Sequence, residues 1–291
     1  MKNIFSKNKF PSLLSCKDLD YMIKDIEISE NLRILDCTFP PSRSIPNFQK
    51  FRIDNARYLD LSSLKDSQSD LTMEFPKPNQ FKEYIDKLGL SKNNIIVCYD
   101  QNGIYSSPRA WFIFKAYHFP QVSILDGGLP KWMESGFDLN TTYITDDDFE
   151  DFEYFQKTKG EEQEGNKNEE FEYDKSLLAS YEEVVAPNYN VTLVDTRPSM
   201  HHQYYKFPNS VNVPVEAFLR EDYTLKSKEE LEKLFDKMKI KNDPNSEIIS
   251  SCGIGLSACL GVFAAKELLE FKNVKLYNGS YEEYIKKQMR K

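Results

Sequence analysis

The chain has few of the residues from which metal sites and disulfide frameworks are built. Its 291 residues include three histidines and five cysteines, and no two cysteines have the C-x-x-C spacing. An odd number of scattered cysteines argues against a disulfide framework and is typical of a protein from a reducing compartment. We therefore expect no structural disulfide, no zinc site and no other bound metal.

Long apolar runs and clusters of basic residues are also missing. No apolar run approaches the roughly 18 residues that span a bilayer, so no membrane span is predicted. The net charge is −8, and residues 146–172 alone hold 12 acidic and 3 basic residues, which leaves +1 for the rest of the chain. The acidity therefore belongs to one segment, and no basic stripe indicates a nucleic-acid partner.

Short apolar runs alternate with helical patterns along most of the chain. The continuous runs at 94–100, 191–195 and 247–250 are typical of buried parallel strands. The segments 79–88 and 228–238 repeat apolar residues with the period of a helix. This alternation predicts an α/β fold in which helices cover both faces of a parallel sheet. Ligands of such sheets bind at the carboxyl ends of the strands.

A shift of 152 residues aligns two parts of the chain without a gap across 33 positions. Under this shift Asp100 falls on Cys252, and Gly103 falls on Gly255. Further matches pair Trp111 with Phe263, Phe119 with Phe271, Val122 with Val274 and Gly127 with Gly279. So many matches at one spacing predict an internal duplication, in which one α/β unit occurs twice.

The duplication and the acidic segment together predict the domain organisation. Residues 1–10 form an extension with three lysines and no acid, which is compatible with a short mitochondrial targeting segment. A first domain over 11–144 and a second over 173–291 flank an acidic linker at 145–172. High charge and few apolar residues predict that the linker is solvated. Only the second domain has a cysteine, Cys252, at the duplicated position.

Cys252 lies between a predicted strand at 247–250 and a predicted helix at 260–271. The small residues around it let backbone N–H groups crowd about one sulfur. The positive end of a helix also stabilises a thiolate. The pattern predicts a nucleophilic or sulfur-carrying cysteine, and the alternative is a buried cysteine in a glycine-containing turn.

Six short motifs carry most of the specific information in the chain. They are SPRAW at 107–111, LDGGLPKW at 125–132, LVDTR at 193–197, NSVNVP at 209–214, CGIGLSAC at 252–259 and YNGS at 277–280. Together they resemble the two-domain rhodanese-like sulfurtransferases, a family that includes thiosulfate and 3-mercaptopyruvate sulfurtransferases. The resemblance extends over residues 12–286 and implies two tandem rhodanese-like domains, of which the first is inactive.

The resemblance implies a sulfurtransferase in which Cys252 is the catalytic residue. A sulfane sulfur would move from 3-mercaptopyruvate or thiosulfate through a Cys252 persulfide to cyanide, a thiol or a thioredoxin-like protein, without a metal or organic cofactor. Backbone N–H groups after the cysteine would stabilise the sulfur anion. The implied substrate-binding residues are Arg197, Gly253, Ile254, Gly255, Leu256, Ser257 and Ala258.

Three departures from the family pattern leave a second hypothesis open. Ile254 stands where the mercaptopyruvate branch has a serine, and Arg52 stands where the first domain has a histidine. His201 falls where a second arginine holds the donor's carboxylate, and a histidine cannot replace a two-armed guanidinium. The alternative is therefore a catalytically weakened rhodanese-fold protein that serves as a structural or docking subunit of a larger assembly. We expect a mitochondrial location, with the cytoplasm as the alternative.

Other features favour one sulfur donor and disfavour two other cysteine chemistries. The neutral residues after Cys252 favour mercaptopyruvate over the thiosulfate dianion. A phosphatase on this fold needs an arginine six residues after the cysteine, where Ala258 stands. A Cys–His hydrolase would need His201 or His202 beside Cys252, and no other motif supports that arrangement.

Overall fold

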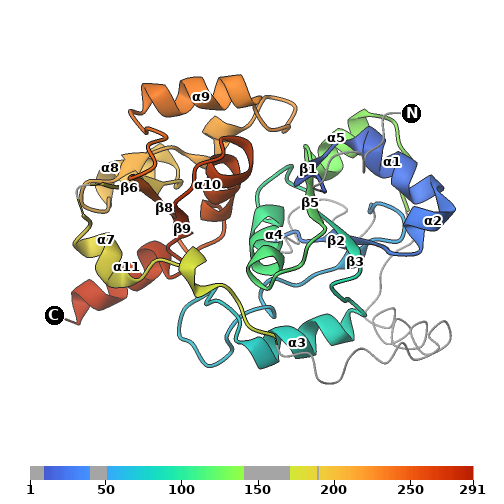
Figure 1. Ribbon diagram of the computed structural model, residues 1–291, viewed down its shortest axis with the longest axis horizontal. Coiled ribbons are helices and arrows are strands. Elements are labelled where there is room, and N and C mark those ends of the chain that lie inside the picture. The colour runs from blue at the N-terminus through green and yellow to red at the C-terminus, as the bar shows by residue number, and fades with distance from the viewer. Residues whose placement is uncertain (1–9, 40–50, 141–170, 189, 291) are drawn as a thin grey trace.

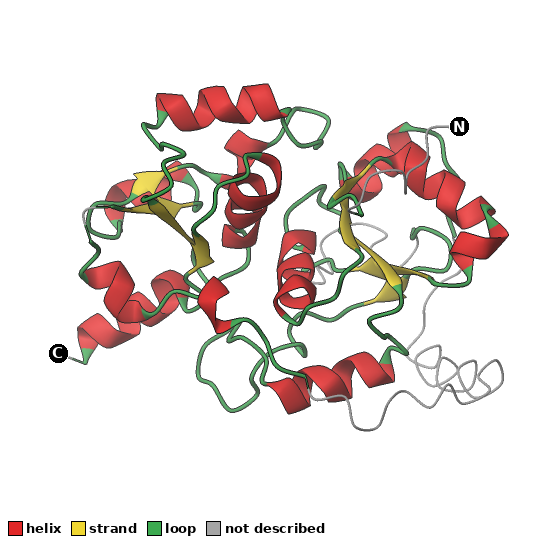
Figure 2. Ribbon diagram, viewed as in Figure 1, coloured by secondary structure: helices red, strands yellow, loops and turns green. Residues whose placement is uncertain are grey.

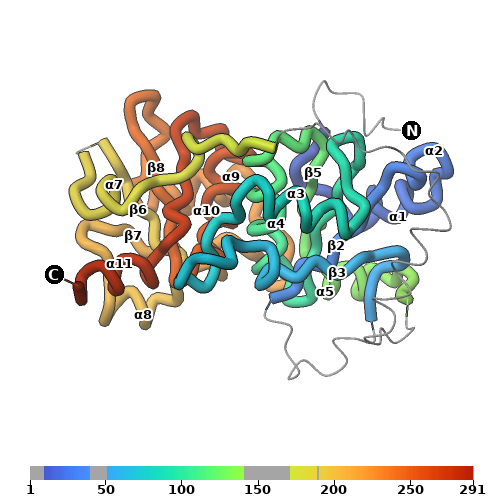
Figure 3. Tube along the Cα trace, turned by 90° about the horizontal axis from the view of Figure 1, so that it is seen from below, coloured from blue at the N-terminus to red at the C-terminus, as the bar shows by residue number. Residues whose placement is uncertain are grey.

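The structure is a computed structural model that describes residues 10–39, 51–140, 171–188 and 190–290. These residues form two α/β halves, which lie side by side in Figure 1 and end to end in Figure 3. Nearly all of the predicted N-terminal extension lies outside the described residues, as does the acidic linker up to residue 170.

The first half is built on a five-stranded sheet in the order β1-β5-β4-β2-β3. Its strands are β1 (Leu13–Leu14), β2 (Leu32–Asp36), β3 (Arg57–Tyr58), β4 (Ile95–Tyr99) and β5 (Val122–Leu125). All four neighbouring pairs are parallel. Every residue of the central strand β4 is buried, as its continuous apolar run predicts.

The second half is built on a four-stranded sheet in the order β7-β6-β8-β9. Its strands are β6 (Val191–Asp195), β7 (Val211–Asn212), β8 (Glu247–Ser251) and β9 (Val274–Leu276), and all pairs are again parallel. Two parallel sheets with helices packed around them confirm the predicted fold class (Figure 2).

Helices connect the strands of both sheets. The first half contains α1 (Cys16–Lys24), α2 (Ile26–Ser29), α3 (Pro78–Lys87), α4 (Ser107–Ala116) and α5 (Gly128–Glu134). The second contains α7 (Tyr181–Val185), α8 (Ser199–Tyr204), α9 (Lys228–Lys237), α10 (Ala258–Phe263) and α11 (Ser280–Met289). Shorter turns are η1 (Lys175–Leu177), η2 (Val215–Phe218) and the π-helical η3 (Ala264–Leu268).

The continuous helix predicted over 260–271 is wrong in its second part. α10 begins two residues earlier, at Ala258, and changes into the π-helix η3 at Ala264. The bond from Leu269 N–H to the Ala264 carbonyl spans five residues instead of four. Apolar spacing did not reveal this change, because a single wide turn buries nearly the same face as an α-helical turn.

The predicted duplication is visible in the backbone of the two halves. Three pairs of residues 152 apart share a left-handed conformation: Gly103 (φ 101°) and Gly255 (φ 84°), Gly128 (φ 55°) and Ser280 (φ 52°), and His118 (φ 64°) and Glu270 (φ 58°). Positive φ is uncommon outside glycine. Agreement at three separate turns, after β4 and β8, after α4 and η3, and after β5 and β9, means that the duplicated segments follow the same path.

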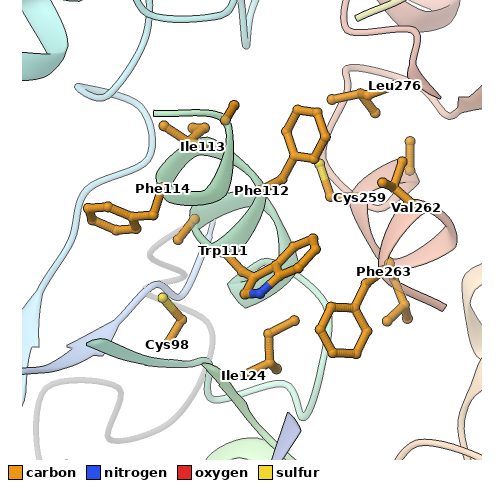
Figure 4. Close-up of a cluster of buried hydrophobic side chains, with 14 of the residues drawn as sticks. Cys98, Trp111, Phe112, Ile113, Phe114, Ile124, Cys259, Val262, Phe263 and Leu276 are labelled. Carbon is orange, nitrogen blue, oxygen red and sulfur yellow. The ribbon is translucent and has the colours of Figure 1, made fainter. Parts of the chain in front are cut away.

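Helices α4 and α10 pack against each other where the halves meet (Figure 4). Trp111 and Phe263, which the shift relates to each other, lie edge to face with ring centroids 4.8 Å apart. Duplicated residues that contact each other are the arrangement of a symmetric dimer interface. One apolar core therefore runs through both halves.

Each half also extends a loop that binds the other. In the first half, the Thr72 N–H donates to the Glu282 carboxylate at 2.9 Å. In the second half, the Leu225 N–H donates to Asp126 at 2.7 Å. The two loops, 66–75 and 220–226, lie at corresponding places in the two halves, the first between β3 and α3 and the second between β7 and α9, so the exchange is reciprocal.

Candidate active site

Cys252 follows β8 directly and is only 2% exposed. The Gly255 N–H donates to the Cys252 Sγ at 3.2 Å, and the Cys252 N–H donates to the Ser280 Oγ at 3.2 Å. A side chain at residue 255 would place its Cβ 2.4 Å from the Asn278 carbonyl oxygen. Glycine is therefore required there, both for its positive φ and for space.

The first half has an aspartate at the position of the cysteine. The Asp100 Oδ2 accepts the backbone N–H groups of Tyr105, Ser106 and Ser107 at 2.9, 3.0 and 2.9 Å. Burial raises the pKa of the Asp100 carboxyl above its usual value, while these N–H bonds oppose the rise. This loop is thus a nest that holds a negatively charged atom two bonds beyond the Cβ.

The structure gathers the predicted loop residues around the Cys252 sulfur. Leu256, Ser257 and Ala258 are buried, whereas Gly253 and Ile254 are half-buried at the outer side of the loop. The Ser257 and Thr196 hydroxyls lie 3.2 Å apart, and the Ala258 carbonyl accepts the Ser250 hydroxyl at 2.8 Å. These bonds fix the loop to the ends of β6 and β8.

Arg197 lies apart from this group. Its Nε and Nη2 bind both oxygens of Asp195, and Nη2 also donates to the Tyr205 carbonyl at 2.6 Å. The guanidinium stacks 3.9 Å from the centroid of the Tyr281 ring. Within the described residues no hydrogen bond joins Arg197 to residues 252–258. The contacts that are present brace the end of β6.

Within the described residues, neither His201 nor His202 makes a hydrogen bond to the Cys252 sulfur. His202 Nδ1 lies 3.0 Å from Asp195, and His201 is exposed on α8. Arg52, which stands in place of the family's histidine, pairs through its backbone with Asn140 in the first half. No group of three or more His, Cys, Asp or Glu side chains is arranged to hold a metal in the part of the chain that is described.

Sequence reasoning missed Ser280, whose hydroxyl lies 3.9 Å from the Cys252 Sγ. The same hydroxyl donates to the Tyr277 carbonyl at 2.9 Å. Ser280 is fully buried with φ 52°, where the first half has Gly128. The sequence did offer one signal, because the 152-residue shift places Ser280 on Gly128, and a serine in place of glycine at a turn suggests strain.

Tyr105 and Cys259 also lie near the Cys252 sulfur in the folded chain. Burial, followed by the negative charges of Cys252 and Glu216, raises the pKa of the Tyr105 phenol. A residue of the first half therefore lies within electrostatic range of the sulfur. Burial raises the pKa of the Cys259 thiol to about 12, so this second thiol is protonated at neutral pH.

Known proteins match both halves of the chain. The family described as "Rhodanese-like domain" matches residues 15–135 and 180–287. Thiosulfate sulfurtransferase of Gallus gallus is 27% identical over 290 residues, which cover 94% of this chain and 93% of that protein. 3-Mercaptopyruvate sulfurtransferase of Mus musculus is 26% identical over 299 residues, with coverage of 94% and 92%.

Solved structures share the whole architecture. SseA of Escherichia coli is described as a 3-mercaptopyruvate sulfotransferase with the rhodanese fold. Its structure aligns with a TM-score of 0.74 at 24% identity, covering 93% of this chain and 99% of that one. The sub-stoichiometric sulfur transferase subunit of yeast mitochondrial complex I aligns with a TM-score of 0.71 at 23% identity, covering 94% and 95%. With both halves matched by one family, this chain belongs to the rhodanese-like proteins, as a two-domain relative of the thiosulfate and 3-mercaptopyruvate sulfurtransferases.

Proposed function

We propose that this protein is an active sulfurtransferase that carries sulfane sulfur on Cys252 as a persulfide. The observation that carries the proposal is the anion nest around Asp100 in the duplicated loop. Asp100 Oδ2 stands two bonds beyond its Cβ, as the outer sulfur of a Cys252 persulfide would. The 152-residue shift assigns the corresponding N–H groups to residues 257–259.

The chemistry of the first step needs only the thiolate and the donor. The Cys252 thiolate attacks the sulfane sulfur, an S–S bond forms, and the bond from that sulfur to the donor breaks. With thiosulfate the leaving group is sulfite. With 3-mercaptopyruvate the electron pair stays on carbon, which takes up the thiol proton, and pyruvate leaves. Backbone N–H groups around the sulfur would stabilise the persulfide anion.

The loop favours 3-mercaptopyruvate as the donor. Gly253 and Ile254, at the outer side of the loop, carry no charge that would attract the thiosulfate dianion. The predicted role of Arg197 as a donor ligand stays a prediction, and its bonds to Asp195 favour a bracing role for Nε and Nη2. A thiol, a thioredoxin-like protein or cyanide would then remove the outer sulfur.

Sulfur loading of Cys252 tests the proposal directly. We expect the full chain, incubated with 3-mercaptopyruvate, to gain about 32 Da, the mass of one sulfur atom, by intact mass spectrometry. The gain should disappear on addition of dithiothreitol and should be absent in Cys252→Ser. Cys259→Ser is the matched control and should load normally, because that thiol is buried and protonated. Failure of both 3-mercaptopyruvate and thiosulfate to load Cys252 would overturn the proposal.

The alternative is a structural or docking subunit of a mitochondrial assembly. It is favoured by the likeness to the yeast complex I subunit, although that likeness is one of fold. That protein is itself titled a sulfur transferase subunit, so assembly and sulfur transfer are compatible. Native gel electrophoresis of an extract from the source cells distinguishes them: the alternative requires that the chain migrates with a large complex and that Cys252 does not load.

A further inference from the structure

Arg109 belongs to the first half, but its guanidinium binds the Cys252 loop of the second. It lies on α4 and is 1% exposed. Nη1 donates to the Gly255 carbonyl at 3.3 Å and to the Asn278 Oδ1 at 2.6 Å, and Nη2 donates to the Met73 carbonyl at 2.8 Å. One side chain thus joins the loop of the active half to a loop of the first half.

This buried cation has no directly paired anion among the described residues. Its three acceptors are neutral, and the Glu74 carboxylate joins the network only through Asn278, whose Nδ2 donates to Glu74 Oε1 at 2.8 Å. A buried charge without a partner is costly. Such a cation is stabilised when a negative charge forms beside it.

The second half has no counterpart of Arg109 that could bind the Asp100 loop in return. The residue 152 positions after Arg109 is Gly261, and a Cβ there would lie 2.5 Å from the Ser250 Oγ. No arginine of α10 can therefore reach back to the Asp100 loop. The cation is supplied to the loop that contains the cysteine and not to its counterpart.

We propose that Arg109 is a positioning residue for sulfur transfer, supplied by the half that lacks the cysteine. The guanidinium holds the carbonyl of Gly255, so that the N–H of the same residue stays on the Cys252 Sγ at 3.2 Å. By holding this N–H it stabilises the Cys252 sulfur anion, while its charge acts directly on the neighbouring Cys259 thiol, where it opposes the rise in pKa that burial causes. The role of Arg109 in sulfur transfer rests on the proposed function. Its effect on the reactivity of the Cys252 thiolate does not, because that reactivity can be measured without a sulfur donor.

The remaining groups near the sulfur are neutral or acidic at pH 7. The other ionisable groups that face Cys252 or its loop are Tyr105, Cys259, Glu282 and, beyond Tyr105, Glu216. The Glu282 carboxylate is already bound by Thr72 and Lys286. Arg109 is therefore the cation in direct hydrogen-bond contact with this loop within the described residues.

The test is the pH profile of Cys252 alkylation by iodoacetamide in the full chain. We expect Arg109→Gln to move the midpoint upward by about one pH unit, which slows alkylation about tenfold at pH 7. Arg33→Gln is the matched control, because Arg33 also binds backbone carbonyls in the first half but contacts Glu30 and Leu32. Its profile should equal that of the unaltered chain. Cys252→Ser identifies any alkylation at other cysteines.

A second variant keeps the test decisive if Arg109→Gln does not fold, as judged by a cooperative thermal transition. Arg109→Lys retains the charge but loses the two-armed contact, so we expect an intermediate shift and about threefold slower alkylation at pH 7. Unchanged profiles in every folded Arg109 variant would overturn the inference, even if Cys252 loads sulfur. A shifted profile without any sulfur loading would overturn the proposed function and leave the inference standing.

Discussion

The loops that follow β4 and β8 share a backbone path but present different side chains to it. In the first loop the Asp100 carboxylate is fixed by four backbone N–H groups, three on Oδ2 and one on Oδ1. In the second loop Cys252 receives one N–H, from Gly255. The carboxylate oxygen of Asp100 lies two bonds beyond the Cβ, whereas the thiol sulfur of Cys252 lies one bond beyond it. The residue at the start of the duplicated turn thus decides how far its acceptor atom reaches toward the backbone N–H groups of the loop.

Each loop is also contacted by the other half. A side chain at Gly103 would meet the Tyr223 Cβ at 2.7 Å, so a residue of the second half covers the first loop. Arg109 of the first half donates to the Gly255 carbonyl of the second loop. The residues at the start of both loops are buried, with Asp100 0% and Cys252 2% exposed. Four substitutions test how far this comparison holds.

The largest effect is expected from Gly255→Ala. A Cβ at this position collides with the Asn278 carbonyl and opposes the positive φ, so the N–H should leave the Cys252 sulfur. We expect the rate of sulfur loading, followed by intact mass, to fall about 100-fold. Gly103→Ala imposes a similar strain on the first loop and should lower the melting temperature without slowing loading per folded chain. Equal loading rates in the two variants would contradict the division of roles.

Asp100→Ala tests whether the first loop is purely structural. The substitution deprives four backbone N–H groups of their acceptor, and those of Ser106 and Ser107 are buried. We expect the free energy of unfolding, measured in urea, to fall by about 3 kcal/mol. Sulfur loading of the folded chain should not change. Cys252→Ala should show the opposite pattern, with no loading and a loss of about 1 kcal/mol.

Ser280→Gly exchanges the residue of one copy for that of the other. Glycine relieves the positive φ, but it also leaves the buried Cys252 N–H without its Ser280 Oγ acceptor, so we expect the free energy of unfolding to fall by about 1 kcal/mol. Loss of the hydroxyl 3.9 Å from the Cys252 Sγ should slow sulfur loading about fivefold. Ser280→Ala removes the hydroxyl and keeps the strain, so it should slow loading equally and lower the stability further. A faster-loading Ser280→Gly variant would show that the hydroxyl has no role.

The smallest effect is expected from Asp222→Asn, which breaks the 2.7 Å ion pair with Lys131 between the halves. The Lys131 hydrogen bond lowers the pKa of Asp222 below its usual value, so the pair stabilises the fold at neutral pH. This contribution is present above about pH 4 and disappears as the pH falls further, because the carboxyl then becomes protonated. Since the pair is solvent-exposed, we expect the melting temperature at pH 7 to fall by at most about 2 °C. A shift that is as large at pH 2 as at pH 7 would contradict the ionic explanation.

Much of the fold followed from local patterns in the sequence. The runs around β4, β6 and β8 predicted parallel strands, because a strand buried on both faces must be apolar throughout. The spacing of 152 residues predicted the duplication, because both copies need glycine at the same left-handed turn. The sequence predicted three elements less well: the two-residue strands β3 and β7 and the π-helix η3. Their lengths depend on packing against other parts of the chain.

The candidate site was only partly predictable. The Cys252 loop could be identified because its residues are consecutive and its small side chains have a local reason. Ser280, Tyr105 and Arg109 come from other segments, and their approach to the loop depends on how strands, helices and halves pack. Arg197 shows the reverse case, because its motif indicated a ligand while its neighbour Asp195 binds two of its nitrogens.

The sequence by itself determined the class of fold and the duplication, and it predicted Cys252 as the residue that would carry sulfur. Each of these depends on residue type and spacing along the chain, which periodicity and motifs record directly. Tertiary structure alone decided that Arg109 of one half holds Gly255 of the other. This contact joins residues far apart in the chain, and its energy depends on burial and on the packing of α4 against α10, which no local pattern contains.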